Sequence, residues 1–490
     1  MASHSASTNT QTDMVPPSKV LIVGAGIGGL FLALLLDKAG IDYEIYERSP
    51  ESQTLGSVLS LNVNILPAFE QIGLYEELLA LSARTDALRF MYDDLRTVAS
   101  LSLENLKEEV GYDCLLLSRS MLYQLLKSKV PTGKIHFGKK VVSSEQNNEE
   151  VTIMCEDGTR YCGSILVGAD GINSGVRKQM YSQLKKENKL PSTDSEEQDK
   201  GYVCLMGTTS PLDAEEYPFV ESKNAVYNHI VGGGSNFSWS EFNVGEKRVC
   251  WIVVLQQTSL SPAEAKRLRN SEWSTNVSEE TLDVIKNLRV PGGRSIGDLV
   301  VSTPDGEVCR VFLEDQVYET WYHGRTVLIG DAAHKLLSSA GQGAVTALQD
   351  ALILANCLYD LSSQSPESIQ NAFQSYKTQR IPHVKEEGAA NRTNALFLHG
   401  QTLWERTVRY LAIHLVPQSV KHSFILKGAS YRPQIAFLPQ TPKRGSGHVL
   451  PQQPSKRYEA QQQKTKYSDA AIAATIAPEA EHAPTVTAVV

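Results

Sequence analysis

Three short glycine-containing segments hold the residues whose types and spacing point to chemistry. The first is Gly24-Ala25-Gly26-Ile27-Gly28-Gly29. We expect Gly24 to permit a tight turn, Gly26 to let a pyrophosphate approach the backbone, and Gly29 to let a helix pack closely on a strand. The pyrophosphate would then meet the unpaired N–H groups at the start of that helix. This segment therefore predicts a dinucleotide-binding site.

The residues around these glycines have the pattern that such a site needs. Residues 19–23 form a nearly all-apolar run, which is typical of a strand in the buried centre of a parallel sheet. An apolar helix pattern over 30–36 follows, and then a strand pattern over 42–46. Glu47 comes directly after this second strand, where we expect its carboxylate to accept hydrogen bonds from ribose hydroxyls. A glycine turn without a ligand is the alternative, but the complete order of elements favours dinucleotide binding.

The second and third segments lie far along the chain. Residues 168–177 read Gly-Ala-Asp-Gly-Ile-Asn-Ser-Gly-Val-Arg, and residues 330–334 read Gly-Asp-Ala-Ala-His after an apolar strand pattern at 326–329. Either segment alone is weak evidence. The three segments in this order and at this separation are strong evidence for one common pocket.

Together the segments resemble the p-hydroxybenzoate hydroxylase-like (group A) FAD-dependent monooxygenases, most closely fungal members from secondary metabolism. The similarity covers roughly residues 19–390. In that family the first segment binds the ADP half of FAD, and a motif D-G-x-x-S-x-V-R is associated with FAD and NAD(P)H binding. The aspartate of a G-D-A-A-H motif contacts the ribityl chain. The resemblance therefore implies Asp170 and Asp331 as cofactor-binding residues, with FAD as cofactor and NAD(P)H as co-substrate.

The family pattern continues to a G-Q-G segment, which Gly341-Gln342-Gly343-Ala344 match at the start of a helix predicted over 345–358. Backbone N–H groups at such a helix start can hold the electron-rich edge of the flavin ring, and the positive helix end stabilises a reduced, anionic flavin. We therefore assign Gly343 and Ala344 to the cofactor site, with a plain helix cap as the alternative. Family members usually carry proline before this segment. This chain lacks it over 335–340, which predicts a more mobile stretch.

Two further residues are assigned to FAD from the resemblance. Arg119 precedes a helix pattern at 121–126 and matches an arginine that contacts FAD in the family; a solvated arginine is the alternative. Gly56 follows Glu47 in a segment where family members line the flavin. We interpret His334 as structural and assign no catalytic residue. Four residues on candidate strands fit either a substrate-facing or a core position: Tyr202, Tyr227, His229 and Trp239.

The activity implied by the resemblance is oxygen transfer. NAD(P)H reduces FAD, the reduced flavin forms a C4a-hydroperoxide with O₂, and this species hydroxylates or epoxidises a small organic substrate of aromatic or terpenoid type. A flavin-dependent reductase or dehydrogenase on the same fold, and a non-enzymatic binding protein that keeps the nucleotide fold, are the alternatives. The pairing of D-G-x-x-S-x-V-R with G-D-A-A-H favours the monooxygenase.

Composition excludes several other classes. The chain has 490 residues, of which 41% are hydrophobic and 21% charged, as expected for a large globular enzyme. Its net charge of −8 argues against a nucleic-acid partner. Seven scattered cysteines show no disulfide framework and no metal-ligand spacing, which predicts a cytoplasmic location and no metal site. We find no apolar stretch long enough for a conventional membrane span.

The alternation of strand and helix patterns along the chain predicts an α/β fold. A doubly wound, Rossmann-like FAD-binding domain is expected over 19–200 and 318–390, after a disordered leader at 1–18. Between its two parts, 201–317 read as an inserted antiparallel β-sheet that forms a substrate domain. A C-terminal helical extension over 391–430 and an extended or disordered tail over 431–490 complete the chain.

The C-terminal helical segment allows two interpretations. Apolar residues between 397 and 425 recur at roughly helical spacing, with basic residues among them. An interfacial helix would place the enzyme in contact with a membrane and would suit a lipophilic substrate. A helix packed on the FAD-binding domain is the interpretation that we favour.

Overall fold

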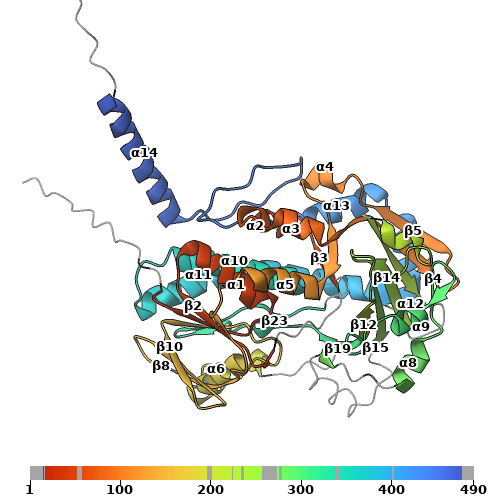
Figure 1. The fold of residues 1–490 in the computed structure, drawn as a ribbon, viewed down its shortest axis with the longest axis horizontal. Helices are drawn as coiled ribbons and strands as arrows, with labels where there is room; N and C mark the ends of the chain where they lie inside the picture. Colours follow the sequence, from red (N-terminus) through yellow and green to blue (C-terminus); the bar gives the residue numbers. More distant parts are fainter. Residues whose placement is uncertain are drawn as a thin grey trace, which may run out of the picture.

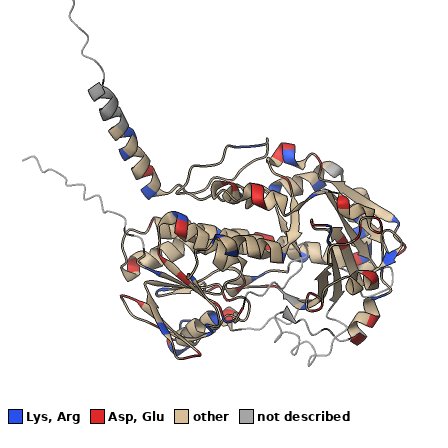
Figure 2. Cartoon of the chain, viewed as in Figure 1, with Lys and Arg blue, Asp and Glu red and all other residues tan. Residues whose placement is uncertain are grey.

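The computed structural model describes the following residues: 15, 17–51, 58–195, 201–222, 224–232, 237–256, 273–274, 277, 279–337, 343–399 and 402–476. Two large sheets lie at opposite ends of the molecule, and helices run between them (Figure 1). Figure 2 shows basic and acidic residues interspersed over the face in view.

The smaller of these two sheets has six strands in the order β21-β22-β11-β1-β2-β7. Their bounds are β1 (Val20–Val23), β2 (Tyr43–Tyr46), β7 (Ile135–His136), β11 (Ile165–Gly168), β21 (Tyr322–His323) and β22 (Thr326–Leu328). All pairs are parallel except β21 with β22. Every residue of β1 and β11 is buried, which explains why both strands read as continuous apolar runs.

Layers cover both faces of this sheet (Figure 1). On one face, α1 (Ile27–Ala39) packs against α5 (Arg119–Lys129) and α10 (Gly343–Tyr359). On the other face lie α6 (Gly175–Lys186) and a three-stranded sheet. The strands of that sheet are β8 (Val141–Gln146), β9 (Val151–Cys155) and β10 (Arg160–Gly163). This arrangement confirms the predicted mixed α/β, nucleotide-binding fold.

The larger sheet has ten strands in the order β16-β19-β12-β15-β14-β13-β4-β6-β3, with β5 paired to β4. Strands from 201–317 are β12 (Gly201–Thr208), β13 (Asn224–Val231), β14 (Phe237–Asn243), β15 (Val249–Gln256), β16 (Trp273–Ser274) and β19 (Cys309–Glu314). Strands from the earlier segment are β3 (Val58–Leu61), β4 (Ala83–Tyr92), β5 (Thr97–Ser102) and β6 (Leu115–Ser118).

The strands from 201–317 pair with one another antiparallel, as expected, but the expectation that this segment alone builds the sheet is wrong. Four strands from 58–118 complete the sheet, and β4 pairs with β13 in parallel. The physical reason is that β13 would otherwise be an edge strand with a row of unpaired backbone groups, which β4 satisfies. The first part of the nucleotide-binding segment thus contributes to both sheets.

Short elements complete the two ends of the molecule. The helices are α2 (Leu66–Gln71), α3 (Tyr75–Ala80), α4 (Leu106–Val110), α8 (Glu279–Ile285) and α9 (Ile296–Val301). The strand pairs are β17 (Arg289–Val290) with β18 (Arg294–Ser295), and β20 (Gln316–Val317) with β23 (His334–Lys335). Helices α8 and α9 cover one face of the larger sheet, where Ile285 and Leu299 join Trp239 and Trp251 in a second core.

The C-terminal part is helical, with α11 (Pro366–His399), α12 (Leu403–Leu415), α13 (Gln418–Gly428) and α14 (Lys456–Ile476). The expected boundary at residue 390 falls inside α11. This long helix contacts β21 of the smaller sheet and β13 to β15 of the larger one, so it spans both ends of the molecule. No helix in the described part of the chain is long and apolar enough to cross a membrane.

The expectation of an extended or disordered tail over 431–490 is wrong for residues 456–476, which are helical, whereas residues 431–455 lack helix and strand but pack on the core. Ile435 and Phe437 are 0% and 4% exposed, because they insert their side chains into the main core. Gln71 holds this segment by accepting from the Ile435 N–H (2.7 Å) and donating to the Ile435 carbonyl (3.1 Å). Residues 456–476 form α14. Residues 477–490, and all of the expected leader before Val15, lie outside the described residues.

Candidate active site

Four parallel strands of the six-stranded sheet end at the same edge. β1 leads into Gly24, β2 into Glu47, β11 into Ala169 and β22, one residue later, into Gly330. In doubly wound sheets, ligands bind outside the carboxyl ends of the strands. A cavity of about 690 Å³ opens at this edge, and residues from all four strand ends line it.

The glycine turn after β1 has the geometry predicted for it. Gly24 has φ +106°, and a Cβ on it would lie 2.4 Å from the Ala169 carbonyl oxygen. A Cβ on Gly29 would lie 2.2 Å from the Gly24 carbonyl oxygen, so α1 packs on the turn as closely as only glycine allows. These two roles are confirmed. A Cβ on Gly26 would meet nothing within 4 Å, which leaves open space beside the backbone at the cavity wall.

Glu47 fixes the glycine turn as well as lining the cavity. Its Oε2 accepts from the Ala25 N–H (2.8 Å) and its Oε1 accepts from the Ser49 N–H (2.9 Å). A carboxylate has about four lone-pair positions, so both oxygens keep capacity to accept further hydrogen bonds. The proposed contact with ribose hydroxyls stays a prediction.

Asp170 caps the start of α6. Its Oδ1 accepts from the Ser174 hydroxyl (2.5 Å) and its Oδ2 accepts from the Val176 N–H (3.1 Å), while Ser174 Oγ accepts from the Arg177 N–H (2.9 Å). Burial raises the pKa of Asp170 above its ordinary value. The residue lines the cavity, but both of its carboxylate oxygens already accept hydrogen bonds within the local turn.

Arg177 joins the second motif to the third. Its side chain is 6% exposed, donates to the carbonyl oxygens of Ile172 and Ala332 (2.9 Å to the latter), and lies 4.4 Å from the Tyr318 ring centroid. This side chain thereby holds together two segments that are more than 150 residues apart in sequence. Our sequence reasoning noted Arg177 only as the last residue of its motif.

Arg119 and Asp331 meet on one wall of the cavity. Arg119 is the first residue of α5 and is half-buried, whereas Asp331 is exposed in the loop after β22. Burial lowers the pKa of Arg119, and the negative charge of Asp331 opposes that shift. The structure therefore brings these two assigned residues together, although their contact with a cofactor stays a prediction.

A buried ion network supports this loop from behind. Asp350 of α10 accepts from His334 Nε2 (2.6 Å), from the Gly330 N–H (2.9 Å) and from Arg380 Nε (2.8 Å). The three side chains are at most 2% exposed. Burial alone would raise the pKa of Asp350, but its interactions with His334 and Arg380 hold it below its ordinary value. The structural interpretation of His334 agrees with these contacts, and Asp350 and Arg380 were missed.

Two helix N-termini face the cavity. Gly26 caps α1, and Gly343 and Ala344 begin α10; all three line the cavity. Neither helix has an acidic residue of its own in the first turn, so no side chain of the helix itself offsets the positive end of its dipole at the cavity. The assigned Gly56, together with Gly341 and Gln342, lies outside the described residues.

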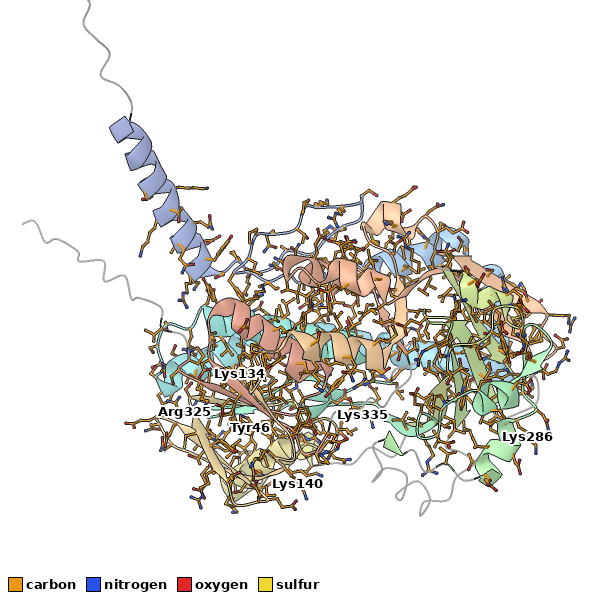
Figure 3. All side chains as sticks on the ribbon, viewed as in Figure 1. Tyr46, Lys134, Lys140, Lys286, Arg325 and Lys335 are labelled. Atoms are coloured by element: carbon orange, nitrogen blue, oxygen red, sulfur yellow. The ribbon has the colours of Figure 1, made fainter. Side chains whose placement is uncertain are left out.

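The opposite wall of the cavity comes from the larger sheet and α11. Its residues, apolar or uncharged apart from the histidine, are Val58, Leu59, Cys204, Met206, Tyr227, Ser240, Ile252, Val254, Val311 and His399. The cavity therefore runs between the two sheets, with backbone-rich walls on one side and strand side chains on the other. Figure 3 labels three further lining residues: Tyr46, Lys140 and Lys335.

Of the four undecided strand residues, Tyr227 is the one that lines the cavity. Burial raises the pKa of its phenol to about 12. His229 is 1% exposed, donates to the Leu398 carbonyl (3.1 Å) and bonds to Ser240 Oγ (2.9 Å). Trp239 is 3% exposed and donates to the Arg289 carbonyl (2.7 Å), and Tyr202 is half-buried. The core interpretation therefore fits these last three residues.

A family model described as an FAD binding domain matches residues 17–196 and 246–387, which is more than half of the chain. The chain belongs to this FAD-binding family. It is 30% identical over 375 residues to the FAD-dependent monooxygenase penM of Penicillium crustosum, covering 74% of this chain and 75% of that relative. Over 439 residues it is 27% identical to the FAD-dependent monooxygenase ausM of Penicillium brasilianum, covering 87% and 88%.

This monooxygenase also shares its fold with solved flavoproteins. Klebsiella pneumoniae HpxO, solved with FAD and uric acid, aligns with a TM-score of 0.67 and 21% identity over 85% of this chain and 97% of that one. CtdE, solved with FAD and its substrate, aligns with a TM-score of 0.63 and 17% identity over 84% and 98%. The predicted relationship to p-hydroxybenzoate hydroxylase-like monooxygenases of fungal secondary metabolism, with FAD as cofactor, is confirmed.

Proposed function

We propose that this monooxygenase uses NAD(P)H and O₂ to insert one oxygen atom into a small lipophilic molecule held between its two sheets. The observation that carries the proposal is the single cavity of about 690 Å³ with two different walls. One wall offers backbone N–H groups and charged residues, which suit a dinucleotide. The other offers apolar strand residues, which suit a lipophilic substrate.

The residues of the first wall fit FAD. The open space beside Gly26 lets a pyrophosphate approach the start of α1, and Glu47 has acceptor capacity for ribose hydroxyls. Arg119 and Asp331 would lie along the ribityl chain, and the start of α10 at Gly343 would face the flavin ring. When bound, FAD supplies the electron transfer from NAD(P)H and the activation of O₂.

The second wall would bind and orient the substrate and exclude water. Met206 and Ile252 supply apolar surface, and the Tyr227 phenol, with Ser240 as its hydrogen-bond partner, supplies a polar point of attachment. A dry pocket protects a reactive oxygen-transfer step from side reactions. A substrate of aromatic or terpenoid type is consistent with this lining.

The described part of this wall offers no strong base that could take a proton from a phenol. Burial holds the pKa of His399 well below its ordinary value, and the Tyr227 phenol stays protonated at neutral pH. Within the described part of the wall, the residues from the larger sheet include no carboxylate. Removing a proton from a phenol calls for a base with a suitable pKa, whereas oxygen transfer to a carbon–carbon double bond does not.

The visible absorption spectrum of the purified protein, before and after NADPH is added in air, tests the proposal. We expect flavin bands that bleach with NADPH and return as O₂ reoxidises the flavin. Product analysis under ¹⁸O₂ should then show one ¹⁸O atom in each product molecule. Flavin reoxidation with no oxygenated product from any lipophilic alkene or aromatic compound would instead indicate a reductase.

A further inference from the structure

Ser240 belongs to a hydrogen-bonded cluster on the cavity face of the larger sheet. In the pairing of β13 with β14 it stands directly opposite His229. Tyr227, two residues before His229, points to the same side of β13, and its ring stacks on that of Phe242 at a centroid distance of 4.7 Å. Ser240 and Tyr227 line the cavity between the sheets, whereas His229 is 1% exposed. A ligand therefore meets this cluster at Ser240 and Tyr227.

The carbonyl oxygen of Leu398 sets the direction of the hydrogen bonds in the cluster. His229 Nε2 lies 3.1 Å from this oxygen, which can only accept, so Nε2 carries the hydrogen. Burial lowers the pKa of His229 to about 4, so the ring is neutral at pH 7 and has no second hydrogen on Nδ1. Nδ1 therefore accepts, and the Ser240 hydroxyl, 2.9 Å away, donates to it.

This donation uses the single hydrogen of the Ser240 hydroxyl. Ser240 Oγ then has only lone pairs left, so it can accept a hydrogen bond but cannot donate a second one. The Tyr227 phenol is its hydrogen-bonding neighbour, and with a pKa of about 12 the phenol keeps its hydrogen at neutral pH. The hydrogen bond between them must therefore run from Tyr227 to Ser240. With its hydrogen used in this way, the Tyr227 oxygen also presents lone pairs to the cavity.

The end of α11 is the origin of this direction. Leu398 lies in the last turn of α11, which packs against β13 and β14. The last four carbonyl groups of a helix have no partner inside the helix, so the Leu398 carbonyl needs a donor from elsewhere. The opposite tautomer of His229 would turn a bare nitrogen toward this carbonyl and leave it unpaired, which is unfavourable for a buried group. The fold thus fixes the tautomer before any ligand binds.

We propose that the substrate presents a hydrogen-bond donor, such as the hydroxyl of a terpenoid alcohol or a phenol, to the lone pairs of Tyr227 and Ser240. The inference rests on the function proposed above and narrows the class of lipophilic substrate. A carbonyl, ether or ester oxygen at this point would face another oxygen with no hydrogen between them. It would lose its hydration without a replacement, so the site should reject it. The donor anchors the substrate and keeps its own proton.

The tautomer of His229 can be measured directly. In the protein labelled with ¹⁵N-histidine, long-range ¹H–¹⁵N correlation spectra distinguish a ring nitrogen that carries hydrogen from one that does not. The variant His229→Gln assigns the signal among the 11 histidines of the chain. We expect hydrogen on Nε2 and none on Nδ1 at neutral pH. Hydrogen on Nδ1 would reverse the hydrogen bonds and overturn the proposal, whether or not the protein proves to be a monooxygenase.

Ligand pairs that differ in the donor test the preference itself. Farnesol is paired with its aldehyde farnesal, and 2-naphthol with 2-fluoronaphthalene; within each pair the size is matched, but the second member has no hydrogen to donate. Perturbation of the flavin absorbance, measured without NADPH, gives a Kd for each compound. We expect each donor to bind at least about tenfold more tightly than its partner. Equal binding within both pairs, or no binding by any of the four, would overturn the preference. Bleaching of the flavin by NADPH reports separately on the proposed function.

Two variants distinguish a directed hydrogen bond from a general loss of packing. Tyr227→Phe should weaken farnesol binding about tenfold and leave farnesal binding unchanged, because it removes an acceptor. Ser240→Ala should instead strengthen farnesal binding at least about threefold, because the Tyr227 hydrogen is released to the cavity. Unchanged farnesal binding in Ser240→Ala would show that Ser240 does not hold this hydrogen, and the proposed direction would be wrong.

Tyr202→Phe is the matched control for these variants. Tyr202 lies on the same face of the larger sheet as the cavity-lining Cys204, two residues along β12, but is not itself a lining residue. Removing its hydroxyl should leave the ratio of the two Kd values as in the wild type. Flavin absorbance and the melting temperature establish that each variant is folded. A ratio that falls equally in Tyr202→Phe and Tyr227→Phe would assign the effect to packing of the sheet and overturn the proposal.

Discussion

The two walls of the central cavity are built on different principles. On the nucleotide side, the chain presents backbone groups at four strand ends, and glycines set how closely each segment approaches the next. On the side of the larger sheet, it presents alternate side chains of strands, such as Met206 and Ile252, which neighbouring strands hold in place. A backbone site tolerates little change, whereas a side-chain surface can be varied one residue at a time.

The largest effect that would test this contrast is expected at Gly29. In the variant Gly29→Ala the new Cβ would lie 2.2 Å from the Gly24 carbonyl oxygen, so α1 or the turn must move. We expect a loss of stability of more than about 3 kcal/mol, because backbone atoms cannot yield as a flexible side chain does. Thermal denaturation followed by circular dichroism measures it.

Gly26→Ala is the matched control for Gly29→Ala. Its Cβ meets nothing within 4 Å, and the φ of −71° suits alanine. We expect a nearly unchanged melting temperature for the FAD-free protein but weaker FAD binding, because the methyl group occupies the space proposed for the pyrophosphate. Equal losses of stability in the two variants would show that the glycines serve the fold alone.

The next effect concerns the buried network behind the loop after β22. Asp350→Asn leaves Arg380, which is 0% exposed, without its charge partner, and we expect a cost of about 3–5 kcal/mol in unfolding free energy. Since the pKa of Asp350 is lowered in the folded chain, its stabilisation is present above its ordinary pKa and is lost as the pH falls through the folded value.

Urea denaturation measures the unfolding free energy of Asp350→Asn, and the variant Glu386→Gln serves as the control. Glu386 pairs with Lys427 at 2.7 Å, but both side chains are more than half exposed, so we expect a change within about 0.5 kcal/mol. The Asp350 variant should also release FAD more readily, since Asp350 holds both Gly330 and His334. A variant as stable as the wild type would contradict the role assigned to this network.

The nucleotide wall was largely predictable from the sequence because its parts are local. The turn at 24–29, the residue after β2 and the loop at 330–334 are each a contiguous run with its own spacing rule. Asp350 was missed because it lies 20 residues after Gly330, inside a predicted helix, where no motif marks it. Its role depends on where α10 packs in the fold, and no sequence motif indicates that position.

The second wall and the tail depend on long-range pairing. β4 joins β13 across more than 130 residues, and no local feature of either strand indicates its partner. The alternation of residues indicates two faces of a strand but does not say which face meets the cavity. Ile435 and Phe437 likewise sit in a proline-containing segment that resembles a tail, and the core that buries them comes from distant parts of the chain.

A pH-dependent effect is expected on the far face of the second wall. Glu241 follows the cavity-lining Ser240 on β14 and therefore points away from the cavity; it is 4% exposed and accepts from Asn228 (2.7 Å). Burial raises the pKa of Glu241 from 4.5 to about 7. The folded chain thus binds this proton more tightly than the unfolded chain does. Its stabilisation is complete below pH 4.5 and is lost as the pH rises through 7.

The variant Glu241→Gln removes this titration and keeps an acceptor for Asn228. We expect it to be more stable than the wild type at pH 8, by about 3 kcal/mol at most, since each pKa unit corresponds to about 1.4 kcal/mol. At pH 4.5 the two proteins should be nearly equal. Melting temperatures across this range measure the difference, and a difference that does not change with pH would contradict the assignment.

The smallest effect is expected for Ser240→Ala on the cavity face of the same strand. The hydroxyl bonds to His229 Nδ1 (2.9 Å) and to the Tyr227 phenol, so its loss should cost about 1–2 kcal/mol of unfolding free energy. FAD should bind as in the wild type, because the change lies on the opposite wall. The Tyr227 phenol would lose a partner, which should change substrate KM or the ratio of oxygenated product to NADPH consumed. Loss of the flavin bands in this variant would show that the two walls are not independent.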